Sequence, residues 1–233
     1  MYNKTMKPLI YVCEDESVIL DTILSFLVAN DYDVRGFTSA LDCLQAFKER
    51  TCDCLITDVN MPTMNGFELV QQVRAFSNVP VIMLTARDAD MDYALGIHLG
   101  ADDYITKPFS TLNLVMRVKA LLRRVQLDLN QQNQERVTFH TLYMDPKTRV
   151  ATAHGKSLEL TPMEYGVLLY LARHYDQAIS REVLLQKVWG YESMVETRAC
   201  DDTIRRLRKK LIGSGISIDT VWGYGFRIME TEV

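Results

Sequence analysis

Three acidic residues, a hydroxyl and an amine stand at or just after short apolar runs of the sequence. Glu14 and Asp15 follow one run, Asp58 ends another, and Thr85 and Lys107 close two more. Three carboxylates in one crevice repel one another unless a cation joins them, and a hard divalent ion with oxygen ligands meets that need. Mg²⁺ is the natural candidate, because water and a phosphoryl oxygen can complete its coordination.

A carboxylate beside Mg²⁺ can attack phosphorus and form an aspartyl phosphate, with Asp58 as the nucleophile. Lys107 and Thr85 would then hold the phosphoryl oxygens. The alternative is that these five side chains are polar residues of ordinary turns. Their coincidence at the ends of separate apolar runs favours the phosphoryl-transfer site.

A phosphatase that works through an aspartyl phosphate is a further alternative. Such an enzyme would use a second carboxylate, two residues after the nucleophile, as a general acid. Asn60 occupies that position, so we expect that the chain is not an enzyme.

The apolar runs predict the elements that carry these residues. They recur about every 25 residues, with helix-like segments between them, as in successive βα units. We expect an α/β fold in which a five-stranded parallel sheet is doubly wound by helices on both faces. The runs are PLIYVC, YDVRGF, CLITDV, VPVIML and DDYITKPF. Ligands of such sheets lie beyond the carboxyl ends of the strands, where the five polar residues should meet.

Length and composition favour two domains. The chain has 233 residues, of which 48% are hydrophobic, enough for a core in each domain. No apolar run approaches the roughly 20 residues of a membrane helix, and the N-terminus lacks the apolar core of a signal peptide. We therefore expect a cytoplasmic protein without a membrane partner. The five cysteines lack metal-site spacing and are expected to be reduced and mostly buried.

The second domain has a different pattern. We expect the first domain at 1–124, a polar linker at 125–135 and an α+β domain at 136–233. Short antiparallel strands precede a helix that opens with a capping box, Thr161 with Glu164. A short helix follows Ser180, a third helix covers about 196–211, and a hairpin with glycines in its turn closes the chain. This is the order of a winged helix-turn-helix.

The third helix carries a concentrated basic segment, RRLRKK at 205–210. Helical periodicity predicts a buried stripe that contains Cys200, Ile204, Leu207 and Leu211. The opposite side is expected to be exposed and to contact DNA, together with a residue of the hairpin: Arg198, Asp202, Arg205, Arg206, Lys209 and Arg227. A merely solvated helix surface is the alternative, but the winged-helix order favours a recognition helix in the major groove.

The motifs CEDE, TDVNMPTMNG, LTAR and DDYITKPF resemble those of a two-component receiver domain. The segment LTPMEYGVLL and the residues after it resemble the effector domain of OmpR/PhoB response regulators. The resemblance implies a flavodoxin-like receiver that accepts phosphate on Asp58 from a sensor histidine kinase. It also implies a homodimer on double-stranded promoter DNA, and RNA polymerase as a further partner.

The resemblance also implies residue roles. Mg²⁺ would be held by Glu14, Asp15, Asp58 and the backbone carbonyl of Asn60, and the switch residues would be Thr85 and Tyr104. The dimer face would include Asp102, Asp103 and Arg117.

Three positions depart from the family pattern. Tyr93 stands where many relatives have a basic residue, His98 where many have an acid, and Trp222 where many have a wing arginine. A tryptophan here could pack against the wing. An alternative function is therefore a phosphorylation-independent winged-helix regulator with an atypical receiver.

Overall fold

The structure is a computed structural model that describes residues 7–86, 100–130, 135–191 and 199–231, with backbone alone for 124–130. The chain divides into two compact units, Met1–Lys119 and Ala120–Val233. The boundary falls inside one helix, so that helix belongs to both units.

The first unit is built on a five-stranded parallel sheet in the order β2-β1-β3-β4-β5. Every residue of β3 is buried, as expected for a central strand covered on both faces. The strands are β1 (Leu9–Cys13), β2 (Asp33–Phe37), β3 (Cys54–Asp58), β4 (Val81–Ala86) and β5 (Asp103–Lys107). All five expected strands are therefore present.

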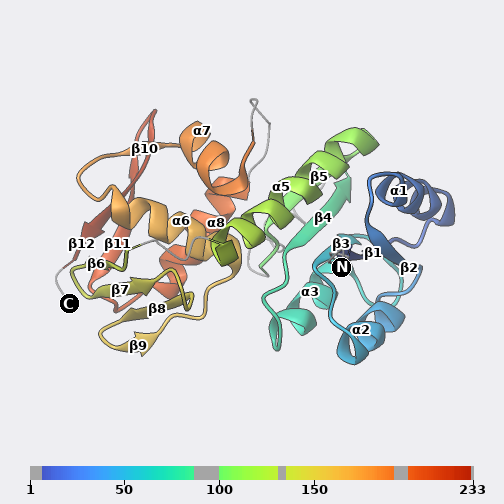
Figure 1. The fold of residues 1–233 in the computed structure, drawn as a ribbon, viewed down its shortest axis with the longest axis horizontal. Coiled ribbons are helices and arrows are strands. Elements are labelled where there is room, and N and C mark those ends of the chain that lie inside the picture. The colour runs from blue at the N-terminus through green and yellow to red at the C-terminus, as the bar shows by residue number, and fades with distance from the viewer. Residues whose placement is uncertain (1–6, 87–99, 131–134, 192–198, 232–233) are drawn as a thin grey trace, which may run out of the picture. The chain divides into compact units, whose positions relative to one another are not determined.

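Helices cover both faces of this sheet (Figure 1). They are α1 (Ser17–Ala29), α2 (Ala40–Glu49), α3 (Gly66–Arg74) and α5 (Thr111–Asn130). The side that carries α2 and α3 packs Tyr11, Leu55 and Met83 of the sheet against Phe47 and Leu69. The doubly wound α/β fold predicted from the sequence is therefore confirmed.

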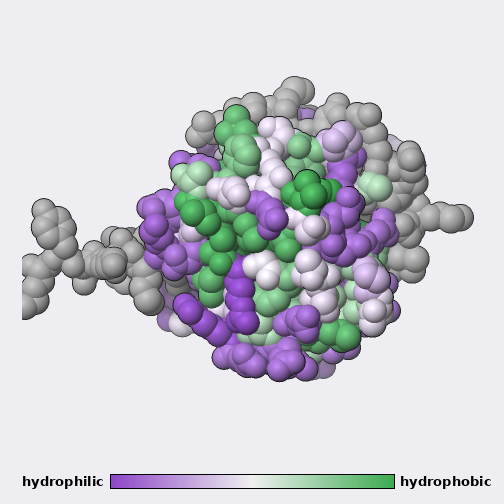
Figure 2. Space-filling view, turned by 90° about the vertical axis from the view of Figure 1, so that its right-hand side faces the viewer, coloured by the Kyte–Doolittle hydropathy of each residue, from purple (hydrophilic) through white to green (hydrophobic). Residues whose placement is uncertain are grey.

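The outer side of α1 keeps several apolar side chains in contact with water. Val18, Phe26 and Val28 are exposed, while Leu20 and Ile23 face the core. Figure 2 shows the side of the unit that includes α1, where hydrophobic residues lie in small groups among hydrophilic ones.

The second unit contains two small antiparallel sheets and a set of helices. One sheet has the order β6-β7-β8-β9 and the other β10-β12-β11. Helix α6 contacts both sheets, through β6 and β12. The strands are β6 (Val137–Phe139), β7 (Leu142–Asp145), β8 (Val150–Ala153), β9 (Lys156–Ser157), β10 (Ile179–Ser180), β11 (Ile216–Val221) and β12 (Gly225–Glu230).

The helices of the second unit are α6 (Pro162–Arg173), α7 (Arg181–Leu184), the π-helical turn η1 (Leu185–Trp189) and α8 (Ala199–Lys210). Of these, α6 and α7 begin directly after the residues that the sequence marks as caps. Thr161 and Glu164 form a complete capping box at α6, and the Ser180 side chain caps α7. The winged-helix arrangement of the second domain is confirmed.

One expectation about the linker is wrong. Helix α5 continues to Asn130, so residues 125–130 are helical, although their composition is polar. A polar sequence can still propagate a helix that has already been nucleated, because each added residue gains a backbone hydrogen bond. The rest of the expected linker, 131–134, lies outside the described residues.

The five cysteines are free and buried, as expected. Burial raises the pKa of Cys52 to about 12, which keeps this thiol protonated and unreactive at neutral pH. Among the helices that the structure describes, none combines the length and the apolar character needed to cross a bilayer.

Candidate functional site

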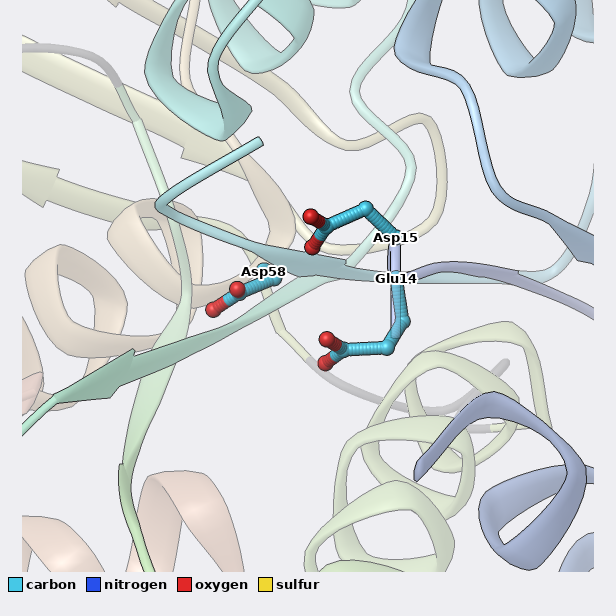
Figure 3. Close-up of side chains that lie close together, drawn as sticks. All are labelled: Glu14, Asp15 and Asp58. Atoms are coloured by element: carbon cyan, nitrogen blue, oxygen red, sulfur yellow. The ribbon is translucent and has the colours of Figure 1, made fainter. Parts of the chain in front are cut away.

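The acidic cluster lies at the carboxyl ends of β1 and β3, which are neighbours in the sheet. Glu14 and Asp15 directly follow β1, and Asp58 is the last residue of β3. One carboxylate oxygen from each lies within 4.8 Å of the other two. Figure 3 shows the three side chains close together at this edge of the sheet. Parallel strands end at one edge of a sheet, which brings together residues that are more than 40 positions apart.

Lys107, at the end of β5, reaches into this cluster. Its Nζ lies 3.1 Å from Oδ2 of Asp58 and 2.7 Å from Oε2 of Glu14. Two of the three carboxylates, those of Glu14 and Asp58, therefore share one ammonium group. The remaining negative charge is what a divalent cation with oxygen ligands would offset, so the donor set fits Mg²⁺.

The pKa values of the cluster reflect its burial. Glu14 is fully buried, and burial raises its pKa; Lys107 opposes this effect, and the charge of Asp58 adds to it. Burial likewise raises the pKa of Asp58, again opposed by Lys107. Burial acts to lower the pKa of Lys107, but its contacts with Glu14 and Asp58 outweigh it, so the pKa is raised. The ammonium therefore stays charged, while the carboxylates are held at a cost in solvation.

The loop after Asp58 fixes the direction of its side chain. The backbone N–H of Val59 donates to Oδ1 of Asp58 at 2.9 Å, and the N–H of Gly66 donates to the Val59 carbonyl at 2.9 Å. A Cβ on Gly66 would lie 1.9 Å from the carbonyl oxygen of Asp58. Only glycine therefore allows α3 to begin this close to the acidic residue.

The other predicted residues of this site lie on β4, on β5 and in the loop after β3. Thr85 is buried in β4, and its hydroxyl donates to the Ala86 carbonyl at 3.3 Å. Tyr104 of β5 is buried within the core cluster on the α2–α3 side. Asn60 is exposed, two residues after Asp58.

The residues expected at the dimer face form buried ion pairs within the chain. Arg117 binds Asp103 at 2.7 Å, and both side chains are at least 95% buried. Asp102 binds Arg74 at 2.9 Å and also accepts from the Val81 N–H. Each of these three residues is at most 4% exposed within the single chain. Their assignment to a dimer face stays a prediction. Sequence reasoning missed Arg74, which lies 28 positions from its partner.

The buried stripe predicted for α8 is confirmed, but the opposite face of the helix is only partly exposed. Cys200, Ile204, Leu207 and Leu211 are buried as predicted. Arg205 and Lys209 are exposed as predicted. Asp202 and Arg206 are only 2% and 5% exposed, so their placement on an open DNA-binding face is wrong. Helix α8 contacts both α6 and β11, which buries a wider arc than one apolar stripe suggests.

Arg206 is occupied inside the domain. Its Nε donates to Oε1 of Glu164 at 3.0 Å, and Lys210 approaches Oε2 of the same carboxylate at 2.7 Å. Burial disfavours the charge of Glu164, but Arg206 and Lys210 outweigh that effect and lower its pKa. Glu164 thus caps α6 and ties it to α8. Its place in the capping box was visible in the sequence, but its second role was not.

The terminal hairpin, β11 with β12, lies beside α8. Arg208 of α8 donates to the Ile218 carbonyl at 2.7 Å and to Oγ1 of Thr220 at 2.8 Å. Arg227 on β12 is half-buried. Arg208 was not singled out from the sequence, although it belongs to the basic segment. Arg198, Tyr93 and His98 lie outside the described residues.

Comparisons with known proteins match both units. Residues 10–119 match the family described as response regulator receiver domain, and residues 155–228 match transcriptional regulatory protein, C terminal. An uncharacterized transcriptional regulatory protein of Bacillus subtilis, YclJ, is 36% identical over 95% of this chain and 99% of its own length.

Solved structures of full-length regulators are also similar to this chain. The response regulator DrrB, described as a Thermotoga maritima OmpR/PhoB homolog, is 29% identical with a TM-score of 0.51, covering 96% of this chain and 100% of DrrB. A mutant of the protein RitR is 27% identical with a TM-score of 0.75 over the same shares of the two chains. Together with the fold and the acidic cluster, these matches show that the chain belongs to the OmpR/PhoB family of two-component transcriptional response regulators, with a receiver domain followed by a winged-helix DNA-binding domain.

Proposed function

We propose that Asp58 is the phosphoacceptor and that a sensor histidine kinase supplies the phosphoryl group. The observation that carries this proposal is the convergence of Glu14, Asp15 and Asp58 within 4.8 Å, with Nζ of Lys107 3.1 Å from Asp58. An oxygen of Asp58 attacks phosphorus while the bond to the kinase histidine nitrogen breaks, and the displaced imidazole leaves with the bonding electron pair.

The residues of the receiver have separate parts in this transfer. Glu14, Asp15, Asp58 and the backbone carbonyl of Asn60 would hold Mg²⁺, which when bound neutralises charge that develops on the phosphoryl oxygens. Lys107 places its ammonium group between Glu14 and Asp58, where it can bind an oxygen of the transferred phosphoryl group. The hydroxyl of Thr85 would turn toward that group, and with Tyr104 it would report phosphorylation to the rest of the receiver.

In the cytoplasm, the effector domain would bind double-stranded promoter DNA as a homodimer. It would then act on RNA polymerase. Arg205 and Lys209 support the DNA contact, because both are exposed on α8. Their charges suit phosphates or guanine edges in the major groove. Asp102, Asp103 and Arg117 would affect the dimer indirectly, since they brace β5 and α5 from inside the receiver.

Asp58→Asn tests the phosphoacceptor directly. Purified wild type, treated with acetyl phosphate and Mg²⁺, should gain the mass of one phosphoryl group and bind promoter DNA more tightly. Asp58→Asn should do neither, whereas Asp21→Asn, at an exposed residue of α1, should behave as wild type. Intact-mass spectrometry and gel shifts at fixed salt measure both effects. If Asp58→Asn and wild type gave equal masses and equal affinities, the phosphorylation-independent alternative would replace this proposal.

A further inference from the structure

The tip of the terminal hairpin exposes two aromatic side chains. Trp222 is 93% exposed and Tyr224 is 55% exposed. The other tryptophan of the chain, Trp189, is fully buried. The sequence left open whether Trp222 packs against the wing, and its exposure excludes that.

The backbone at this tip is well defined. The last pair of the ladder is Val221 with Gly225, and the N–H of Tyr224 donates to the Val221 carbonyl at 3.0 Å. Gly223 has a φ of 71°, which a turn tolerates best at glycine. Gly225 must also be glycine, because a Cβ there would lie 1.9 Å from the Ile179 carbonyl of β10. The hairpin is therefore anchored at its base and presents Trp222 on a constrained turn.

A tryptophan held in water forgoes most of the free energy that burial of its indole would supply. Single exposed apolar residues need no explanation, but two exposed aromatic residues on one short turn form an aromatic tip. Tryptophan and tyrosine are also the residues that interfaces favour, since they combine a large apolar surface with a polar atom. The two exposed aromatic side chains therefore indicate that the tip contacts a binding partner.

The charges next to the tip indicate what that partner is. Arg208 bonds to Thr220, two residues before Trp222, so a guanidinium lies beside the strand that leads to the tip. Arg205 and Lys209 are exposed on the same helix, which contacts strand β11 of the hairpin, so further cations belong to the neighbouring element. A partner must therefore offer many anionic groups and, next to them, a slot for an aromatic ring. The minor groove of duplex DNA offers both.

We propose that Trp222 enters the minor groove of the bound duplex as an apolar wedge, partly unstacks one base step there and bends the DNA. The proposal rests on the DNA-binding function of this domain and goes beyond it by assigning one residue as a wedge and the unstacking of one base step. The indole N–H can donate to the acceptors that A·T pairs present in the minor groove, adenine N3 and thymine O2. Flexible steps such as TA are the easiest to unstack, so the wedge favours such a step at its position.

An apolar wedge differs from an arginine in a measurable way. A cation that neutralises a phosphate releases counterions, which adds about 0.9 to the slope of log K against log salt concentration. Trp222 releases none. Trp222→Ala should therefore weaken binding equally at all salt concentrations, whereas Trp222→Arg should steepen the slope by about 0.9. Arg205→Ala should make the slope shallower by a similar amount.

The full-length protein allows a direct test, with a duplex selected in vitro against the phosphodonor-treated wild type. Because Trp189 is buried, nearly all of the acrylamide-quenchable fluorescence should come from Trp222. Adding the duplex should remove this quenching, and Trp222→Phe supplies the Trp189 background to subtract. Quenching of Trp222 that persists at saturating duplex would overturn the wedge.

Affinity and bending complete the test. Trp222→Ala should bind at least about fivefold more weakly, as expected for loss of an aromatic contact with bases, and should bend the duplex less in a circular-permutation gel assay. Trp222→Phe should restore much of the bend, because a phenyl ring can still act as a wedge. The control is Ile212→Ala, since this apolar side chain is 82% exposed but lies away from the tip.

The outcomes separate this proposal from the function on which it rests. Wild type that binds no duplex would overturn DNA binding and the wedge together. Wild-type binding with equal affinity and bend in Trp222→Ala would overturn the wedge alone. Protection of Trp222 that depends on protein concentration and not on DNA would assign the tip to a protein interface and likewise overturn the wedge.

Discussion

Two adjacent arginines of α8 have different surroundings and therefore different roles. Arg205 is exposed, whereas Arg206 is 95% buried against Glu164. A buried carboxylate that loses its partner leaves a charge in a medium that solvates it poorly, which is costly. The basic segment thus combines a structural residue with residues available to DNA.

Arg206→Ala should therefore reduce stability, while Arg205→Ala should reduce DNA affinity. Removing Arg206 leaves the buried Glu164 carboxylate with Lys210 and the Thr161 N–H, and we expect a loss of about 3 kcal/mol in the free energy of unfolding. Arg205→Ala should change stability by less than about 0.5 kcal/mol and weaken binding by about 1 kcal/mol or more. Urea unfolding and gel shifts at fixed salt measure the two quantities.

The pH dependence of the free energy of unfolding tests the structural role of Arg206 in a second way. The pKa of Glu164 lies below its ordinary value of 4.5, so the ion pair contributes fully above about that pH. Its contribution is lost as the pH falls through the lowered pKa, where the carboxylate becomes protonated. The difference in stability between wild type and Arg206→Ala should therefore shrink in acid. A constant difference would mean that Arg206 acts through packing alone.

At the scale of elements, the junction of β3 with α3 holds the proposed phosphoacceptor site together. Asn65 and Glu68 form a capping box at α3, and Gly66 lies against the backbone of Asp58. The start of the helix and the position of the acidic residue are therefore coupled. A change in one should be detectable in the other.

Gly66→Ala and Asn65→Ala should separate the effects of contact and capping. A Cβ on Gly66 forces the Asp58 backbone to move, so we expect a loss of about 1–3 kcal/mol in stability and less phosphorylation by acetyl phosphate. Asn65→Ala should cost about 1 kcal/mol through its lost cap but leave phosphorylation largely intact. Urea unfolding and intact-mass measurement report both. Equal phosphorylation of the two variants would contradict this coupling.

At the scale of the whole molecule, the chain forms two compact units that carry different candidate sites. The acidic cluster lies in the first unit, and α8 with the terminal hairpin lies in the second. Only α5 belongs to both, because the boundary at residues 119 and 120 falls within it. Binding of a ligand to one unit should therefore stabilise that unit first.

Calorimetry should resolve two unfolding transitions. We expect Mg²⁺ to raise the midpoint of one and a selected duplex to raise the midpoint of the other, because each ligand binds only the folded form of its own unit. Arg206→Ala should lower the transition that DNA raises, and Gly66→Ala the one that Mg²⁺ raises. A single transition that both ligands shift equally would show that the units unfold as one.

The fold and the acidic site were predictable because their signals are local. Each strand of the receiver is a short apolar run, and Asp58 ends one of them. Parallel strands end at a common edge, so Glu14, Asp15, Asp58 and Lys107 had to meet once the sheet was recognised. The capping box of α6 was equally readable, since its residues are three positions apart.

The tertiary structure decided which charges are available at the surface. Arg206, Asp102 and Asp103 carry charge in the sequence, yet partners on distant elements bury all three: Glu164 lies 42 positions from Arg206, and Arg74 lies 28 from Asp102. Conversely, only the three-dimensional course of the hairpin shows that Trp222 faces water. Helical and strand periodicity specify the direction of a side chain relative to its own element, and exposure depends on what other elements pack against it.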